Sequence, residues 1–427
     1  MSKNIFLRLD WLSILIFLLL VSFGILSIYS TTFSEIHVSI FNWSTPAGKQ
    51  FLIFTFCLLL LPLILLINPN IFEHLSTVFY VLSLVSLIGL FVFGEKINGA
   101  LSWYLIGGFS FQPSEFAKIT TAILVSKSLS SIQIDLNKTS DLIKIILSII
   151  IPVILIFLQP DAGSGIVFFG LIFVLIREGL DIRVLYLGLL LVLLFILSLL
   201  FNPIGLSIAI LVIFLLVYRL IVRTYPKTNK KPFILVFAIS ALFIFSVDFI
   251  FNSVFEQRHR DRFNIVLGLE TDSKGIGYNI NQSKIAIGSG GFLGKGFLNG
   301  TQTKGGFVPE QHSDYIFSTI GEEWGFLGSF TLIILYTILI LRIIFRAEKQ
   351  TQPFPRIFSY SFASMLFIHF FINIGMTLGL VPTVGIPLPF ISYGGTNLLV
   401  MFICFGILIR IHIENKKRVS QGVQGGY

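Results

Sequence analysis

Long apolar runs separated by short polar segments make up most of this chain. A helix that crosses a bilayer needs about 20 apolar residues, or about 17 at the short end. Nine good candidates are 11–30, 50–68, 76–94, 143–158, 184–201, 233–251, 326–345, 357–380 and 396–412, and three weaker ones are 113–130, 163–176 and 204–222. The runs lack a two-residue alternation, so the pattern predicts an all-α polytopic membrane protein with about twelve transmembrane helices, and not a barrel.

Composition supports an integral membrane protein. Hydrophobic residues make up 55% of the chain and charged residues only 12%, against about 25% charged residues in soluble domains. Cys57 and Cys404 both lie inside apolar runs, which supports neither a disulfide framework nor a metal cluster. The first run, 11–29, is uncharged and no small-residue cleavage site follows it, so we expect a retained span and not a signal peptide.

The basic residues predict the orientation. With twelve spans and a cytoplasmic N-terminus, most Lys and Arg residues fall on cytoplasmic segments, as the positive-inside rule requires. Both termini are then cytoplasmic. The net charge of +9 therefore reflects topology, and its distribution argues against a nucleic-acid partner.

Two extracytoplasmic segments break this rule, 95–118 and the large polar loop 252–313. They hold, or adjoin, Lys96, Lys118, Arg258, Arg260, Arg262, Lys274, Lys284, Lys295 and Lys304. Cations on the outer side suggest an anionic ligand such as a phosphate. The alternative is solvated loop charge, which we favour for Lys274 or Lys304 singly. The three arginines together favour an anion site, because guanidinium groups match phosphate oxygens.

Asp314 stands where the large loop meets the next apolar run. We expect it to open a helix, one face of which would carry Asp314, Ser318, Gly321 and Gly325 and leave a cleft below the acid. A half-buried carboxylate there suits a general base. An N-cap or first-turn acid is the alternative, and Glu322 and Glu323 are as well explained by structural roles.

The loop sequence SGGFLGKG resembles a phosphate cradle only superficially. It lacks the Walker spacing and a preceding strand. Close backbone packing, or a short re-entrant element, is the better interpretation.

Three further segments hold candidate residues. In FQPSEFAK, Glu115 and Lys118 are three apart on one helix face and can pair, either structurally or at a ligand site. In QPDAGSG, Asp161 either caps the next helix or faces the same cleft. The segment 381–395, VPTVGIPLPFISYGG, predicts irregular backbone that forms a cleft wall, where a lipid chain would lie.

These motifs occur in the order seen in the SEDS family (shape, elongation, division and sporulation proteins). FQPSEFAK, QPDAGSG, the run from QSKIAIGSGGFLGKGFLNGTQ to PEQHSDYIF, and NIGMTLGLVPTVGIPLPFISYGG together span nearly the whole chain. The wording GKGFLNGTQ resembles the RodA elongation branch more than the FtsW division branch. The chain departs from the usual family sequence at three places. In GALSW, Ser102 replaces a common basic residue, and Ser313 replaces the commoner Thr. Thr396-Asn397 stands where Ser-Ser or Ser-Ala is usual. The family typically has ten spans, so we assign the two extra ones to 204–251.

The resemblance implies a peptidoglycan glycosyltransferase that polymerises lipid II with a class B penicillin-binding protein in the elongation (rod) complex. It places the essential acid on Asp314, which would activate the attacking GlcNAc 4-hydroxyl while undecaprenyl pyrophosphate leaves. A divalent cation (Mg or Mn) would neutralise that leaving group, although the sequence shows no ligand cage for it. As substrate-binding residues we assign Glu115, Lys118, Asp161, Arg258, Arg260, Arg262, Lys284, Lys295, His312 and Ser392.

Two other classes of function compete with the enzyme. A transporter that flips lipid-linked precursors would also need many spans, but we find no internal repeat of the kind that transporters often show. A scaffold that only positions a transpeptidase would not need an acid and a basic loop on the outer side.

Overall fold

The computed structural model describes residues 8–33, 39–97, 99–107, 109–224, 231–253, 255, 257–269 and 275–420. The chain divides into two compact units: Met1–Leu180 with Tyr278–Tyr427, and Asp181–Gly277. The first unit contains every sequence motif discussed above except the arginine cluster.

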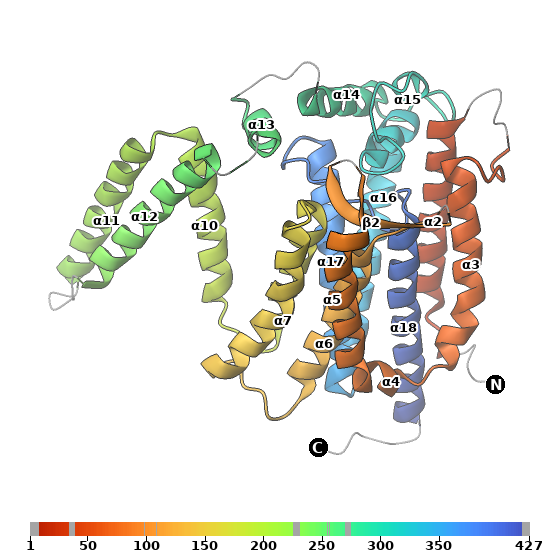
Figure 1. The fold of residues 1–427 in the computed structure, drawn as a ribbon, viewed down its shortest axis with the longest axis horizontal. Helices are drawn as coiled ribbons and strands as arrows, with labels where there is room; N and C mark the ends of the chain where they lie inside the picture. The colour runs from red at the N-terminus through yellow and green to blue at the C-terminus, as the bar shows by residue number, and fades with distance from the viewer. Residues whose placement is uncertain are drawn as a thin grey trace. The chain divides into compact units, whose positions relative to one another are not determined.

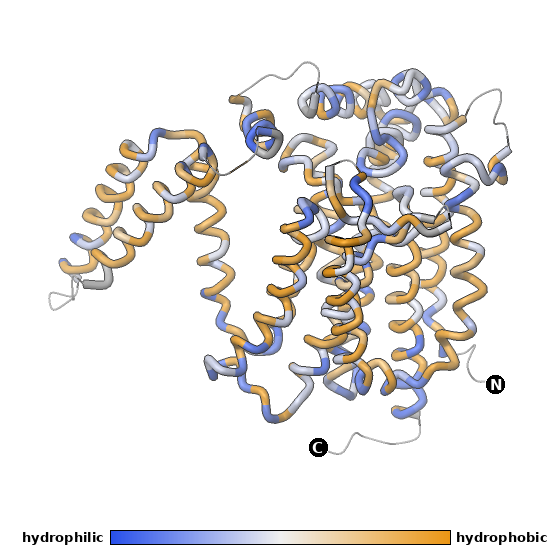
Figure 2. Tube along the Cα trace, in the orientation of Figure 1, coloured by the Kyte–Doolittle hydropathy of each residue, from blue (hydrophilic) through white to orange (hydrophobic). Residues whose placement is uncertain are grey.

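Helices make up most of the first unit (Figure 1). In chain order they are α2 (Trp11–Thr32), α3 (Pro46–Leu66), α4 (Pro69–His74), α5 (Ser76–Phe93), α6 (Pro113–Ser130), α7 (Thr139–Phe157), α8 (Ala162–Val167), the 3₁₀ turn η1 (Phe168–Gly170), α9 (Leu171–Arg177), α14 (Ile276–Ser289, whose first two residues belong to the second unit), α15 (Thr301–Lys304), α16 (Ile316–Glu348), α17 (Pro353–Thr377) and α18 (Gly395–Ser420). Figure 2 shows that the long helices of this unit are largely hydrophobic and that hydrophilic residues gather toward their ends.

The second unit contains α10 (Arg183–Leu200), α11 (Pro203–Thr224), α12 (Lys231–Ser253) and α13 (Gln257–Val266). Helix α12 packs against both α10 and α11. The predicted extra spans 204–222 and 233–251 correspond to α11 and α12.

Ten helices in the described part of the chain are long and apolar enough to cross a membrane. They match ten of the twelve predicted runs. The two remaining runs are helical as well, but 113–130 forms the more polar helix α6 and 163–176 is divided among α8, η1 and α9. Helix α6 tolerates its Ser, Thr, Glu and Lys residues because it packs between α5 and α17, where most of these side chains are buried.

The expectation of helices alone overlooked a small sheet. Strands β1 (Glu95–Ile97), β2 (Ala100–Ile106) and β3 (Phe109–Phe111) pair antiparallel in the order β1-β2-β3 between α5 and α6. Ser102 of the GALSW segment lies on β2 and is only 1% exposed. β1 and β3 have only three residues each, and the seven residues of β2, ALSWYLI, do not alternate between apolar and polar, so the sequence gives no strand period.

The core of the first unit gathers around α17 and α18. Within their most apolar stretches, 72% and 78% of the residues are buried, against 17% in α3. Helices α2 and α16 complete this core, with Phe17 stacked on Phe405 and Tyr336 donating a hydrogen bond to the carbonyl of Pro389. The other long helices therefore present more of their apolar surface outward, as lipid-facing helices do.

Helix α16 is broken at Gly325, whose φ of 63° only glycine adopts readily. In an unbroken helix the amides of Phe326 and Leu327 would bond to the carbonyls of Glu322 and Glu323. Here they bond instead to the carbonyls of Gly291 and Phe292, at 2.9 and 3.1 Å, while the Glu322 and Glu323 carbonyls accept from the amides of Lys295 and Gly296, at 3.0 and 2.9 Å.

We call residues 290–296 the glycine loop. It replaces two intrahelical hydrogen bonds with four and leaves neither side of the break unpaired. Close backbone packing, one of the two interpretations of this sequence, is therefore confirmed.

An ion-pair cluster ties the start of α2 to the far end of α16. Arg342 Nε donates to both carboxylate oxygens of Asp10, at 2.9 and 3.0 Å, Ser13 Oγ donates at 2.8 Å, and Arg346 Nε lies 3.3 Å from Asp10 Oδ2. Burial alone would raise the pKa of Asp10, but the hydrogen bonds from Arg342 and Ser13 and the charges of both arginines lower it to about 2.

We predict that Asp10→Asn lowers the free energy of unfolding at neutral pH by about 2 kcal/mol. A lowered pKa contributes stability above the unfolded value near 4, and this is lost as the pH falls toward 2. The melting temperatures of wild type and variant in detergent should therefore differ at pH 7 and converge with acidification. The exposed pair Asp181–Arg183 provides the control, since Asp181→Asn should change little. Equal melting temperatures at pH 7 would contradict the prediction.

Candidate functional site

Asp314 lies in a turn, residues 310–315, that we call the acid turn. The amides of Ser313 and Tyr315 both donate to the carbonyl of Glu310, at 3.1 and 3.2 Å, so the helical ladder starts only at Ile316. The expectation that Asp314 opens the helix was therefore wrong, because Tyr315 and not Asp314 occupies the N-cap position. The predicted face also ends at Gly325, where the helix breaks. Asp314 is half-buried, as a general base in a cleft requires.

The acid turn is bound to residues 381–395, which we call the proline segment. Ser392 Oγ donates to the carbonyl of Ser313 at 2.6 Å, and the amide of Tyr393 donates to the carbonyl of His312 at 2.8 Å. Asn373 Nδ2, on α17, donates to the carbonyls of both Asp314 and Ile386, at 2.9 and 2.7 Å. Two elements distant in sequence, the proline segment and α17, thus fix the backbone on which the acid sits.

The Asp314 carboxylate itself faces the proline segment. Gly385 has a φ of 71°, and a Cβ built on it would lie 3.2 Å from Asp314 Oδ2. The start of α8 packs on the same segment, since a Cβ on Gly163 would lie 2.3 Å from the carbonyl oxygen of Val384. The proline segment therefore borders the acid, and the expectation that it forms the wall of a cleft stays a prediction.

Asp161 caps α8. Its Oδ1 accepts the amide of Ser164 at 3.1 Å, and its Oδ2 accepts from Gln112 Nε2 at 3.0 Å. The capping role left open by the sequence is thus present, two residues before Gly163 meets the proline segment.

The predicted pair of Glu115 and Lys118 is confirmed at 2.7 Å, with both residues 1% exposed. Glu115 Oε2 also accepts from Asn397 Nδ2 at 2.9 Å, and Lys118 Nζ lies 3.1 Å from His369 Nε2. Burial together with these protein partners favours the structural interpretation over direct ligand contact.

Lys295 pairs with a carboxylate of the broken helix. Its Nζ lies 2.8 Å from Glu322 Oε1, and Glu322, which is fully buried, also accepts the amides of Gln302 and Thr303 at the start of α15, at 2.8 and 2.9 Å. Glu322 therefore has the structural role that the sequence allowed, and the Lys295 ammonium already has a partner.

The other assigned residues differ in access. Lys284 is exposed on α14, with its side chain over Gly379. His312 is half-buried beside Tyr393, with ring centroids 5.6 Å apart. Burial lowers the pKa of His312, although the charge of Glu310 opposes this. Ser392 is 4% exposed, and its hydroxyl donates a hydrogen bond to the acid turn.

The arginine cluster lies on α13 in the second unit. Arg260 donates to the carbonyl of Asn252 and to Gln257 Oε1, at 3.1 and 2.8 Å. Arg262 is partly buried. The side chain of Arg258, and the whole of Lys274, lie outside the described residues. The anion site predicted for the three arginines stays a prediction.

Sequence reasoning missed His369, noted Asn397 only as a departure from the family sequence, and noted Asn373 only as part of the NIGM motif. His369 and Asn373 lie one turn apart on α17, and both are 0% exposed. A polar residue inside an apolar run gives no local signal of what it contacts, so only the structure shows that these two hold the proline segment.

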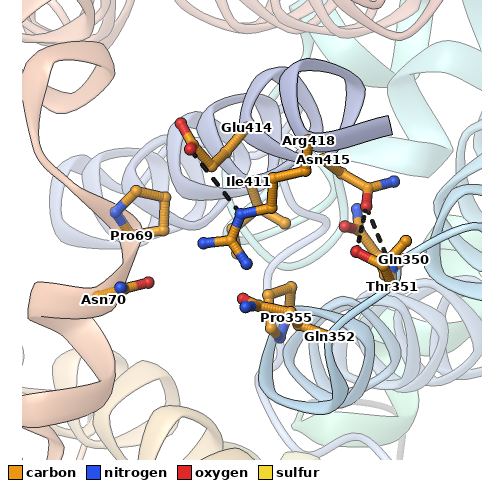
Figure 3. Close-up of a pocket in the computed structure, with 10 residues that line it drawn as sticks. All are labelled: Pro69, Asn70, Gln350, Thr351, Gln352, Pro355, Ile411, Glu414, Asn415 and Arg418. Carbon is orange, nitrogen blue, oxygen red and sulfur yellow. Dashed lines mark hydrogen bonds and ion pairs between the residues drawn. The ribbon is translucent and has the colours of Figure 1, made fainter. Parts of the chain in front are cut away.

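A separate pocket lies away from the acid turn, between α4, α18 and the turn that joins α16 to α17 (Figure 3). Asn415 Oδ1 accepts from the amide and hydroxyl of Thr351, at 3.1 and 3.0 Å, and Arg418 reaches toward Glu414. The pocket contains none of the assigned residues. In the part of the chain that the structure describes, no group of three or more His, Cys, Asp or Glu residues could hold a metal ion.

Comparison with known proteins places this architecture in a family. The family model described as "Cell cycle protein" (FtsW, RodA, SpoVE) matches residues 10–233 and 190–417. The chain is 33% identical over 358 residues to peptidoglycan glycosyltransferase MrdB of Escherichia coli K12, covering 84% of this chain and 82% of the relative. It is 30% identical over 425 residues to peptidoglycan glycosyltransferase RodA of Treponema pallidum, covering 94% and 97%.

A solved structure has the same fold. It is described as "Structural coordination of polymerization and crosslinking by a peptidoglycan synthase complex", and one of its chains matches with a TM-score of 0.71 and 24% identity, covering 95% of this chain and 98% of that one. Fold, motifs and relatives agree that the chain belongs to the FtsW/RodA/SpoVE family of cell cycle proteins.

Proposed function

We propose that this chain is a peptidoglycan glycosyltransferase that polymerises lipid II into glycan strands during cell elongation, with Asp314 as its catalytic base. The activity follows that of the named relatives. The proton of the attacking GlcNAc 4-hydroxyl passes to the Asp314 carboxylate as the oxygen bonds to the MurNAc anomeric carbon. The bond from that carbon to the diphosphate breaks, and undecaprenyl pyrophosphate leaves with the electron pair.

The observation that carries this proposal is the setting of Asp314. Its carboxylate is half-buried, and its backbone is held by α17 and the proline segment. Positioned general bases contribute about 10² to 10⁴-fold in rate, and they need a fixed geometry to do so. A carboxylate with no role beyond solubility would not need two distant elements to hold its turn.

We also propose that the acid turn faces the extracytoplasmic side and that both termini are cytoplasmic. The opposite end of the first unit carries most of its arginines, since Arg342 and Arg346 bind Asp10 there, and Arg410 and Arg418 flank Glu414. An excess of basic residues marks the cytoplasmic end of a membrane protein.

The proposal includes a class B penicillin-binding protein as partner, because a chain of the same fold was solved within a peptidoglycan synthase complex. The described residues do not fit a protein-built metal site. If Mg²⁺ or Mn²⁺ takes part, its ligands would come from the diphosphate of the substrate, and we derive no step through it.

The proposal is tested by incubating the purified full-length chain, with its transpeptidase partner, with lipid II, with and without Mg²⁺ or Mn²⁺, and separating the products on a gel. We expect long glycan strands. Lipid II movement across a vesicle membrane without polymer would instead indicate the transporter. Normal partner binding with no polymer under any condition would indicate the scaffold.

A further inference from the structure

A chain of polar contacts crosses the buried core of the first unit from α18 to α17. Asn397 Nδ2 donates to Glu115 Oε2 at 2.9 Å, Lys118 Nζ donates to Glu115 Oε1 at 2.7 Å, and Lys118 Nζ lies 3.1 Å from His369 Nε2. No residue in this series is more than 6% exposed. We call it the buried network.

The order of these contacts fixes the proton position on His369. An ammonium group can only donate hydrogen bonds, so His369 Nε2 must be the acceptor. The ring proton then lies on Nδ1, which is 3.1 Å from the carbonyl oxygen of Pro387 and donates to it. The buried network therefore ends on the backbone of the proline segment.

Asn373 makes the matching contact one helical turn away. It lies four residues after His369, on the same face of α17, and its Nδ2 donates to the carbonyls of Ile386 and Asp314. Helix α17 thus holds two consecutive carbonyls of the proline segment. The next residue back, Gly385, is the one whose backbone borders the Asp314 carboxylate.

We propose that His369 and Asn373 are positioning residues, which hold residues 384–388 in register with the acid turn and so set the orientation of the Asp314 carboxylate. This inference rests on the proposed catalytic role of Asp314. Neither residue touches the reacting atoms. They act through the backbone, because the irregular proline segment has carbonyls that no helix or sheet satisfies and that need donors from elsewhere.

The Lys118–Glu115 pair orients His369 in this arrangement. With its ammonium directed at Nε2, Lys118 keeps His369 in the one tautomer that donates to Pro387. Glu115, held by Asn397, orients Lys118 in turn. The Lys118–Glu115 pair, which the sequence predicted, would therefore influence Asp314 without contacting the substrate.

Two amide variants of His369 separate its contact with Lys118 from its contact with the Pro387 carbonyl. In His369→Asn the side-chain amide nitrogen replaces Nδ1 and retains the donor to Pro387. In His369→Gln the amide oxygen replaces Nε2 and retains the acceptor for Lys118, but the donor is lost. We expect His369→Gln and Asn373→Asp to lower kcat about 10- to 100-fold, as small displacements of catalytic groups do, with little change in KM for lipid II. His369→Asn should stay within about three-fold of wild type.

A second readout does not depend on activity. Hydrogen exchange of the full-length chain, bound to its partner, should show faster exchange in His369→Gln and Asn373→Asp at the amides of the proline segment, namely Thr383, Val384, Gly385, Ile386 and Leu388. Ser361→Ala is the matched control, since Ser361 is also fully buried on α17, but its hydroxyl bonds the carbonyl of Ile357 in its own helix and lies 3.5 Å from Ser126 Oγ on α6. It should change neither exchange at these amides nor kcat.

The outcomes are distinguishable from those that test the proposed function. If the exchange rates of the proline segment are unchanged in both variants, or if His369→Asn is as impaired as His369→Gln, the inference is overturned. If Asp314→Asn polymerises lipid II at the wild-type rate, the proposed function fails, while the exchange measurement still decides whether α17 holds the segment. Faster exchange with a fall in kcat at constant KM supports the inference, whereas a general loss of folded protein that Ser361→Ala shares counts against it.

Discussion

Asp314→Asn should abolish most glycan synthesis, with a fall in the rate of lipid II polymerisation of about 10² to 10⁴-fold. The amide has nearly the size of the carboxylate, so the contact with Gly385 and the hydrogen bond from Asn373 Nδ2 to the Asp314 carbonyl should persist. What disappears is the group that accepts the hydroxyl proton. Initial rates at saturating lipid II, with equal amounts of folded protein and partner, measure the effect.

Asp248→Asn is the matched control for this change. Asp248 is also a carboxylate near the end of an apolar helix, but it bonds Asn252 within α12 and has no part in the acid turn. The same chemical substitution there should leave the rate within about two-fold. If Asp314→Asn retained the wild-type rate, the base would have to be sought elsewhere in the chain.

Gly290→Ala should strongly destabilise the protein, because this position of the glycine loop packs directly against the backbone of α16. A Cβ at this position would lie 2.0 Å from the carbonyl oxygen of Gly321 and 2.8 Å from that of Glu322. Both are backbone atoms and cannot swing aside as a side chain would. Overpacking typically costs about 1–3 kcal/mol, and we expect the upper end or more, seen as a lower melting temperature in detergent.

Gly288→Ala is the control for this change, because Gly288 lies only two residues from Gly290. A Cβ there meets nothing within 4 Å, and the residue lies in α14. Gly288→Ala should therefore be neutral or stabilise by up to about 1 kcal/mol, since alanine favours a helix over glycine. Equal melting temperatures for the two variants would show that the loop does not pack on α16 as closely as the structure has it.

The helical membrane architecture could be predicted from apolar run length, because a bilayer imposes a minimum length that a sequence displays openly. The pairing of Glu115 with Lys118 followed from their spacing on one helix face, and the capping by Asp161 was one of two readings that its position allowed. Each of these depends on residues close together in the chain.

What the sequence did not reveal depends on contacts between distant segments. The break in α16 at Gly325 exists because the glycine loop supplies hydrogen-bond partners for the backbone there. A Gly within an apolar run does not by itself predict such a break. The roles of His369 and Asn373 likewise depend on carbonyls of the proline segment, more than ten residues away. Asp314 lies ahead of the helix because the carbonyl of Glu310 accepts the amides of Ser313 and Tyr315. The sequence does not show such a local hydrogen-bond choice.

The glycine loop also constrains how this protein can change over evolutionary time. Loops ordinarily tolerate insertions and deletions, since their ends are fixed and their middles are free. Here the amides of Lys295 and Gly296 and the carbonyls of Gly291 and Phe292 each pair with a fixed position on α16. One added or lost residue would shift these partners out of register and leave polar backbone groups at the break without their hydrogen bonds. We therefore expect natural variants to keep the length of this segment even where its side chains differ.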